Sequence, residues 1–331
     1  MFKDLKVIIS MLKQEQSPKI LCISHIKDVD GCVCAALIRY ATKSQFLLTN
    51  YGNINQCLRR VENKYDLIYI CDLGINESIM KEFDRIQQNT EITYIDHHNI
   101  DEGLLEKLEK MDIKIVHDQR DSAGVLTFNL FKEVLPREAG LLAAYAAISD
   151  RLEDGPIAKK IIQQYDREFI LYETMLLSYT LSKADDSFKK RIVHRLSNLE
   201  YPHRIKDVPA LAQEQVERIA VLRNELPLKA SKIGDIVFIE VIEDSPGAIA
   251  NLLLDVCEAT IGICYRTNSQ MQVSDLSIRG SASIKVDLGK ITSQLAKQFD
   301  GFGGGHPKAC GARIPTPRIM EFISALVKHI E

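Results

Sequence analysis

Short apolar segments rich in β-forming residues alternate with helical segments through the first third of the chain. Ile20–Ser24, Asp66–Cys71 and Glu91–Ile95 have the length and composition of buried strands. Gly31–Tyr40 and Glu77–Ile86 lie between them and have the spacing of apolar residues typical of helices. This alternation predicts an α/β fold with a doubly wound, mostly parallel sheet covered by helices on both faces. Because ligands bind such sheets beyond the carboxyl ends of the strands, the residues that follow each strand are candidate functional residues.

The length of 331 residues suggests two domains. Helical segments dominate from Ser122 to about Leu196, and the segment 197–225 combines prolines with an amphipathic helix at about 211–222. Strand-like and helical segments resume after it, and Gly301–Gly305 is predicted to form a loop before a last strand and helix. We therefore expect an α/β domain in residues 1–196, a linker with a helix in residues 197–225 and a smaller α/β domain in residues 226–331.

The composition is that of a globular protein, with 46% apolar and 26% charged residues. The longest apolar run, Leu141–Ile148, has eight residues, whereas a membrane span needs about 20. The N-terminal residues include Lys3, Asp4 and Lys6 and lack the long apolar stretch of a secretory signal. We expect a cytoplasmic protein without membrane contact, in which the eight cysteines are buried free thiols.

Charge is unevenly distributed along the chain. The net charge of −3 gives no sign of the broad basic face found on proteins that bind duplex nucleic acid. Residues 276–320, however, carry seven Lys and Arg against two acids, a local charge of +5, which leaves −8 for the rest. This segment would attract a phosphate-bearing ligand, and a solvated basic face is an equal alternative.

Acids and histidines follow the predicted strands and also end an apolar helix. They are His25, Asp28 and Asp30 after the first strand, Asp72 after the second, Asp96, His97 and His98 after the third, and Asp150 at the helix end. Singly, Asp72 fits a helix N-cap, Asp30 a turn before Gly31, and Asp150 a helix end. Together at one sheet edge, they would repel one another unless cations lay among them. Carboxylates and imidazoles without thiolates favour hard or borderline ions such as Mn²⁺ or Mg²⁺, and two such ions are the arrangement used for phosphoryl displacement.

These blocks resemble the DHH phosphoesterase superfamily, which is known for its Asp-His-His motif. The matching blocks are His25-x-x-Asp28-x-Asp30-Gly31, Asp72, Asp96-His97-His98 and Asp150. The later blocks Leu276-Ser-Ile-Arg279-Gly-Ser281 and Gly303-Gly304-Gly305-His306 resemble the DHH-associated C-terminal domain of RecJ-type nucleases and NrnA oligoribonucleases. The resemblance leaves out the helical segment at about 151–222.

The resemblance implies a role for each matching residue. His25, Asp28 and Asp72 would bind one metal ion, and Asp30, Asp72, His97 and Asp150 the other, so that Asp72 bridges them. Asp96 would orient an imidazole, and His98 would contact the scissile phosphate or transfer a proton. In the later domain, Arg279, Ser281, Gly303, Gly304, Gly305 and His306 would bind the substrate, with the active site in the cleft between the domains. One departure from the family pattern is the two-residue spacing, Ile26 and Lys27, between His25 and Asp28. His117, Asp118 and Asp121 are further polar residues that could approach the site or simply lie at the surface.

The expected function is that of a Mn²⁺-dependent phosphoric diester hydrolase, a nuclease with two divalent metal ions. The resemblance implies exonuclease activity that releases nucleoside 5′-monophosphates from short single-stranded RNA or DNA. A phosphodiesterase acting on cyclic dinucleotides or their linear products is one alternative. A non-catalytic replication or repair scaffold is another, and a DNA repair or replication protein and a second copy of the chain are candidate partners.

Overall fold

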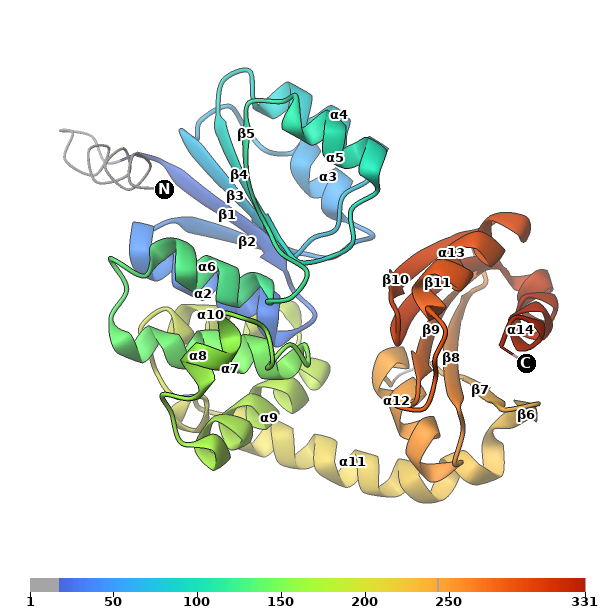
Figure 1. Ribbon diagram of the computed structural model, residues 1–331. Coiled ribbons are helices and arrows are strands. Elements are labelled where there is room, and N and C mark those ends of the chain that lie inside the picture. Colours follow the sequence, from blue (N-terminus) through green and yellow to red (C-terminus); the bar gives the residue numbers. More distant parts are fainter. Residues whose placement is uncertain (1–17, 243, 331) are drawn as a thin grey trace. The chain divides into compact units, whose positions relative to one another are not determined.

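The computed structural model describes residues 18–242 and 244–330 (Figure 1). The expectation about a secretory signal concerns the first residues, which lie outside this range. The chain divides into two compact units, one ending at Gln215 and the other beginning at Val216. Each unit has its own sheet and its own hydrophobic core. The helix α11 (Val208–Lys229) spans the boundary and includes the predicted helix at 211–222.

The first unit contains a five-stranded parallel sheet, as the alternation of segments predicts. Its strands are β1 (Ile20–His25), β2 (Gln45–Thr49), β3 (Leu67–Cys71), β4 (Glu91–Asp96) and β5 (Ile113–His117). The order is β2-β1-β3-β4-β5, so the chain moves to one side of β1 and then returns to its other side. The connections after β1 and β3 therefore leave the sheet in opposite directions, and the carboxyl ends of these two strands are where sheets of this kind bind ligands.

Alternate residues of the strands belong to two different cores, because successive side chains of a strand point to opposite faces. Cys22 and Tyr69 pack with helices α2 (Val29–Thr42), α6 (Ala123–Phe131) and α7 (Gly140–Ser149). Ile23 and Ile70 pack with helices on the other face, namely α3 (Ile54–Arg59), α4 (Glu77–Ile86) and α5 (Glu102–Glu109). Figure 1 shows these helices on the two faces of the sheet.

The helical layer on the α2 face continues beyond α7. It consists of α8 (Ala158–Ile162), α9 (Arg167–Lys183) and α10 (Asp186–Leu196). The buried face of α10 includes Phe188, Ile192 and Val193, which join the same core as α2. The middle of the chain is thus helical, as expected, and its helices enlarge the hydrophobic core on the α2 face of the sheet.

The second unit contains a six-stranded mixed sheet in the order β10-β11-β9-β8-β7-β6. The strands are β6 (Ser231–Ile233), β7 (Ile236–Glu240), β8 (Ile261–Asn268), β9 (Val273–Gly280), β10 (Phe302–His306) and β11 (Ala309–Pro315). The helices of this unit are α12 (Pro246–Val256), α13 (Leu288–Gln298) and α14 (Ile319–Lys328). The prediction of a smaller second α/β domain is confirmed at the level of fold.

The prediction of a loop at Gly301–Gly305 is wrong, because most of this segment forms the edge strand β10. Gly304 and Gly305 have φ angles of 154° and 139°, which favour glycine over residues with a Cβ atom. A Cβ atom on Gly305 would also lie 2.7 Å from the Ala309 carbonyl oxygen. The glycines therefore permit close pairing of β10 with β11.

All eight cysteines are free thiols, and six of them are buried, in agreement with the expectation from the sequence. Within residues 18–242 and 244–330, no helix combines the length and the apolar composition needed to cross a bilayer.

Candidate metal centre

The acids and histidines of the first unit meet at the carboxyl edge of its sheet. His25 ends β1, Asp72 follows β3 and Asp96 ends β4. Parallel pairing of these neighbouring strands brings the three positions to one edge. Asp150 reaches the same place from the C-terminal end of α7. The structure therefore brings together residues that are up to 125 positions apart in the sequence.

His25, Asp28 and Asp72 form one group of possible metal ligands. The Nδ1 atom of His25 lies 2.8 Å from Asp28 Oδ2 and 3.5 Å from Asp72 Oδ2. Asp28 is also the N-cap of α2, and its Oδ1 accepts a hydrogen bond from the Gly31 amide at 3.1 Å. Gly31 must be glycine here, since a Cβ atom would lie 2.4 Å from the His25 carbonyl oxygen.

Asp30, His97 and Asp150 form a second group. The Nε2 atom of His97 lies 3.2 Å from Asp150 Oδ2 and 3.7 Å from Asp30 Oδ2. It also lies 3.5 Å from Asp72 Oδ1. Asp72 thus directs one carboxylate oxygen toward His25 of the first group and the other toward His97 of the second. This is the position that a bridging ligand between two cations requires.

Asp30 is held in place by the N-terminus of α6. Its two carboxylate oxygens accept hydrogen bonds from the backbone amides of Ala123 and Gly124, at 2.9 and 2.7 Å. A helix N-terminus stabilises negative charge, which offsets part of the cost of burying this acid. Asp30 is completely buried. The start of α6 therefore orients a possible metal ligand.

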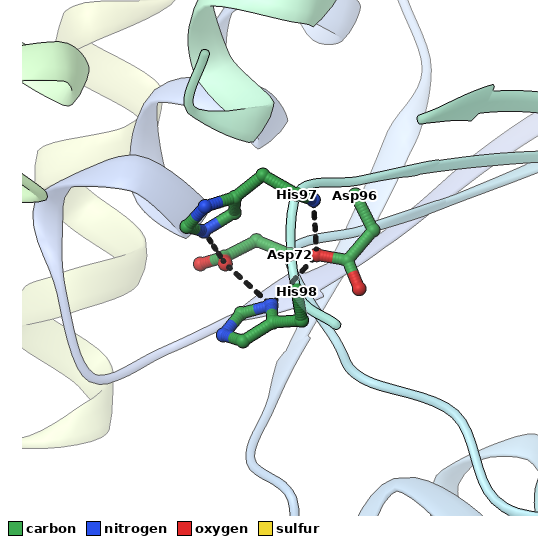
Figure 2. Close-up of side chains that lie close together, drawn as sticks. All are labelled: Asp72, Asp96, His97 and His98. Atoms are coloured by element: carbon green, nitrogen blue, oxygen red, sulfur yellow. Dashed lines mark hydrogen bonds and ion pairs between the residues drawn. The ribbon is translucent and has the colours of Figure 1, made fainter. Parts of the chain in front are cut away.

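Asp96 holds both histidines of the Asp-His-His motif. Its Oδ1 accepts hydrogen bonds from the His97 backbone amide and from His98 Nδ1, each at 2.8 Å, and its Oδ2 is bonded by the Tyr94 hydroxyl. Figure 2 shows the rings of His97 and His98 directed toward Asp72. The ion pair with His98 outweighs the effect of burial and holds the pKa of Asp96 well below its usual range. Asp96 is therefore an ionised acceptor that orients imidazoles.

Tyr51 is a further residue of the site that the sequence analysis missed. It follows β2, and its hydroxyl lies 2.8 Å from His98 Nε2. Its ring centroid lies 4.6 Å from that of His25. The position at the end of a strand could have identified it, but β2 was not among the strands predicted from the sequence.

The electrostatics of the cluster reflect many acids buried together. Burial and the nearby Asp28 carboxylate raise the pKa of Asp72, and burial with Asp150 raises that of Asp30. Burial disfavours the charged form of His97, but its contacts with Asp150 and Asp72 outweigh this effect and raise its pKa to about 12. Protons on these groups are the alternative to a cation, and the ligands must lose them when a metal binds.

The residues fit a divalent cation. Asp72 Oδ2 is buried, and no donor among the described residues makes a hydrogen bond of good geometry with it, since His25 Nδ1 stays 3.5 Å away. A buried carboxylate oxygen without a donor is costly unless a cation or proton satisfies it. The donor atoms are carboxylate oxygens and imidazole nitrogens, which suit Mn²⁺ or Mg²⁺.

Three further polar residues that the sequence analysis singled out have separate roles. His117 Nε2 lies 2.7 Å from the His98 carbonyl oxygen and so supports the backbone of the motif. Asp118 pairs with Arg120. Asp121 is buried and accepts hydrogen bonds from the amides of Ile157 and Ala158 at the start of α8. Asp118 and Asp121 are therefore explained by local structure.

The residues predicted to bind substrate lie in the second unit. Arg279 in β9 and His306 in β10 both pair with Ala309 of β11, so they lie at the same end of three adjacent strands. Ser281 follows β9, and its hydroxyl bonds that of Ser283 at 2.7 Å. Gly303 pairs with Ala312, toward the opposite end of β10, whereas Gly304 and Gly305 lie between it and His306.

Comparison with known proteins identifies two domains. Residues 19–151 match the model of the DHH family, N-terminal domain, and residues 235–331 match that of the DHHA1 domain. A comparison with curated protein sequences gave no match.

Solved structures share the fold at low sequence identity. A DHH domain described as belonging to a family of ribosomal proteins is 16% identical with a TM-score of 0.72, covering 95% of this chain and 86% of its own. RecJ of Thermus thermophilus in complex with Mn²⁺ is 16% identical with a TM-score of 0.64, and the match covers 97% of this chain and 53% of RecJ. The pGpG-specific phosphodiesterase PggH of Vibrio cholerae is 13% identical with a TM-score of 0.54, and the match covers 94% of this chain and 98% of PggH.

Proposed function

The chain belongs to the DHH superfamily of phosphoesterases, with a DHHA1 domain after the DHH domain, and we propose that it is a metal-dependent phosphodiesterase of short single-stranded oligonucleotides. Its products would be nucleoside 5′-monophosphates. The observation that carries this proposal is the position of Asp72. Its two oxygens lie 3.5 Å from imidazole nitrogens of two different ligand groups.

We assign the ligands of two divalent ions to these groups. His25, Asp28 and Asp72 would hold one ion, and Asp30, Asp72, His97 and Asp150 the other. Mn²⁺ is the first candidate and Mg²⁺ the second, since the RecJ structure that shares this fold was solved with Mn²⁺. When bound, two such ions activate water and stabilise the attacking and leaving oxygens of a phosphodiester.

The residues around the proposed ligands would prepare the reaction. Asp96 fixes the orientation of His98 through the 2.8 Å hydrogen bond to Nδ1. We propose that His98 contacts the scissile phosphate or transfers a proton to the leaving oxygen. Because His98 is about one-quarter exposed at the side chain, a substrate could reach it.

The second unit would bind the remainder of the nucleotide. An Arg guanidinium grips phosphate oxygens through two hydrogen bonds, and backbone amides near glycines can approach phosphate without a Cβ atom in the way. We assign these roles to Arg279, His306 and Ser281, with the strand of Gly303, Gly304 and Gly305 beside them.

Two observations favour short substrates. The chain has no Trp and a net charge of −3, and long single strands need repeated stacking and charge contacts. PggH, whose fold matches over 98% of its length, acts on pGpG, whereas the Thermus thermophilus RecJ chain is about twice as long as this chain. A linear dinucleotide is therefore a second candidate substrate. The complete set of acids and histidines argues against a non-catalytic scaffold, which needs no metal ligands.

The proposal is tested with end-labelled oligonucleotides of increasing length, incubated with the purified protein and Mn²⁺. We expect a ladder of shortened products that ends in mononucleotides and requires the metal. The Asp72→Asn variant at equal concentration is the control for a contaminating nuclease. If wild-type and variant protein give the same ladder, the proposed function is wrong.

A further inference from the structure

Tyr51 combines a fixed hydroxyl with an accessible ring at the edge of the metal centre. Its hydroxyl lies 2.8 Å from His98 Nε2, and the two rings meet edge to face with centroids 5.6 Å apart. Its centroid lies 4.6 Å from that of His25. The residue is nevertheless 46% exposed, so its contacts with the two histidines leave much of the side chain free.

The hydroxyl completes a chain of hydrogen bonds to His98. Nδ1 of His98 is bonded to Asp96 Oδ1 at 2.8 Å, and Nε2 is bonded to Tyr51 at 2.8 Å. Two partners on opposite sides of an imidazole ring fix both its tilt and its rotation. Tyr51 therefore restrains the side of His98 that Asp96 does not, and this bond would have to open when Nε2 turns to the substrate phosphate.

The ring has the properties of a stacking surface. The Tyr51 side chain has a flat apolar ring and a polar hydroxyl, and here the hydroxyl is bonded while part of the side chain is exposed. Bases stack on such rings, and each stacked base contributes about 1–3 kcal/mol. A base resting on Tyr51 would be held beside His25 and His98, next to the residues proposed to bind metal.

We propose that Tyr51 is the substrate-positioning residue of this centre, with its ring stacked on a nucleobase next to the scissile phosphate and its hydroxyl holding His98. This inference rests on the proposed function and names the group that the first unit recognises on the substrate. Tyr51 then has two roles, stacking through its ring and holding His98 through its hydroxyl. Different substitutions remove each of them.

The experiment compares Tyr51→Leu and Tyr51→Phe on a dinucleotide and on two analogues, in each of which one base is replaced by hydrogen. Tyr51→Leu removes the ring and should raise KM for the dinucleotide about tenfold or more, the size of one lost stacking contact. On the analogue that lacks the stacked base, wild-type protein and Tyr51→Leu should have similar KM values. Tyr51→Phe keeps the ring and should lower kcat several-fold with KM unchanged, because only the restraint on His98 is lost.

Tyr65→Phe is the matched control, since the Tyr65 hydroxyl bonds Gln45 at 2.9 Å, away from the carboxyl edge of the sheet. It should leave both constants unchanged. Mn²⁺ binding, measured by calorimetry, should be the same for all variants. The inference is overturned if Tyr51→Leu loses as much on both analogues as on the dinucleotide, or if both Tyr51 variants behave as wild type. If the wild-type protein cleaves no nucleotide at all, the proposed function fails instead.

Discussion

Asp72 is the residue on which the proposed chemistry depends most. It has a φ angle of 55°, a conformation that Asn and Asp tolerate better than other residues with a Cβ atom. Burial and the Asp28 carboxylate raise its pKa, so its ionised form destabilises the folded protein. A buried carboxylate with a raised pKa, within a cluster of titratable groups, is a candidate functional residue.

Substituting Asp72 by Asn should therefore separate function from stability. The amide is a poor bridge between two cations, so Mn²⁺ affinity should fall and turnover should be lost. The fold should survive, because Asn accepts the same backbone angles, and the melting temperature without added metal should equal or exceed that of the wild type. Calorimetric Mn²⁺ titration and thermal unfolding measure both effects. Near-normal activity in this variant would exclude the bridging role.

A second substitution tests the division of labour within the Asp-His-His motif. His98 bonds Asp96 and Tyr51, whereas His97 faces three carboxylates. The His98→Ala variant should bind as much metal as the wild type. Its kcat should fall by a factor on the order of 10², the usual effect of removing a proton-transfer group. Metal content is measured by elemental analysis after dialysis. A loss of metal from this variant would instead make His98 a ligand.

At the scale of elements, burial on both faces decided which strands could be predicted from the sequence. β1, β3 and β4 lie inside the sheet and are buried almost throughout, with mostly apolar residues, so they stood out. β2 and β5 are edge strands with polar residues such as Gln45 and Lys114, and neither was predicted. Missing β2 also meant missing Tyr51, which lies at its end. The metal-ligand candidates could be identified because each follows an inner strand or a strongly apolar helix.

The glycine-rich segment is another strand that the sequence analysis missed. Composition alone favours a loop at Gly303–Gly305, since glycine is a poor strand former. Its place in β10 depends on hairpin pairing with β11 across Pro307 and Lys308, which the composition of the segment itself does not reveal.

The packing of α6 against α2 and α7 leads to a prediction about stability. A Cβ atom at Gly124 would lie 2.6 Å from Ala146 Cβ and 2.9 Å from Asp30 Oδ1. Gly124→Ala should therefore lower the free energy of unfolding by about 1–3 kcal/mol. Activity should fall as well, since Asp30 must move. Urea unfolding and a Mn²⁺-dependent assay measure the two effects.

Gly103→Ala in α5 is the control for the helical propensity of alanine. Gly103 is exposed, and its nearest contact would be Asp101 Oδ1 at 3.3 Å. This variant should be as stable as the wild type or more stable by about 0.5–1 kcal/mol. If Gly124→Ala changes the free energy of unfolding by the same amount as Gly103→Ala, close packing at α6 does not determine which residue position 124 accepts.

At the scale of the whole molecule, the two units divide the proposed tasks. The candidate metal ligands fall between residues 25 and 150, and the candidate phosphate-binding residues between 279 and 306. The second group lies in the segment of charge +5. Substrate binding and metal binding should therefore respond to different substitutions.

Arg279→Ala tests this division. A lost hydrogen bond between charged groups corresponds to about a tenfold or larger rise in KM for a dinucleotide. Bis-p-nitrophenyl phosphate contains no nucleotide for Arg279 to hold, so its rate of hydrolysis should change much less. The Mn²⁺ affinity should not change. Arg266→Ala, an exposed arginine of the neighbouring strand β8, is the matched control. Equal losses on both substrates would mean that Arg279 serves the chemistry or the fold.

The length of the preferred substrate follows from the small number of groups that can hold a nucleotide chain. Each stacked base needs its own aromatic surface, and in the part of the chain that the structure describes the exposed Tyr and Phe side chains are Tyr51, Tyr172 and Phe302. Of these, Tyr51 lies at the metal centre, and Phe302 lies in the basic segment with the Arg313 guanidinium over its ring. Added nucleotides would thus gain little binding energy after the first few.

We expect kcat/KM to be highest for substrates of about two to five nucleotides. We expect it to be lower for a cyclic dinucleotide than for its linear form, because a ring offers no free end to Arg279 and His306. Steady-state rates on a length series measure this. A value of kcat/KM that still rises beyond about ten nucleotides would favour a processive exonuclease, and a cyclic dinucleotide that exceeds its linear form would favour a signalling phosphodiesterase.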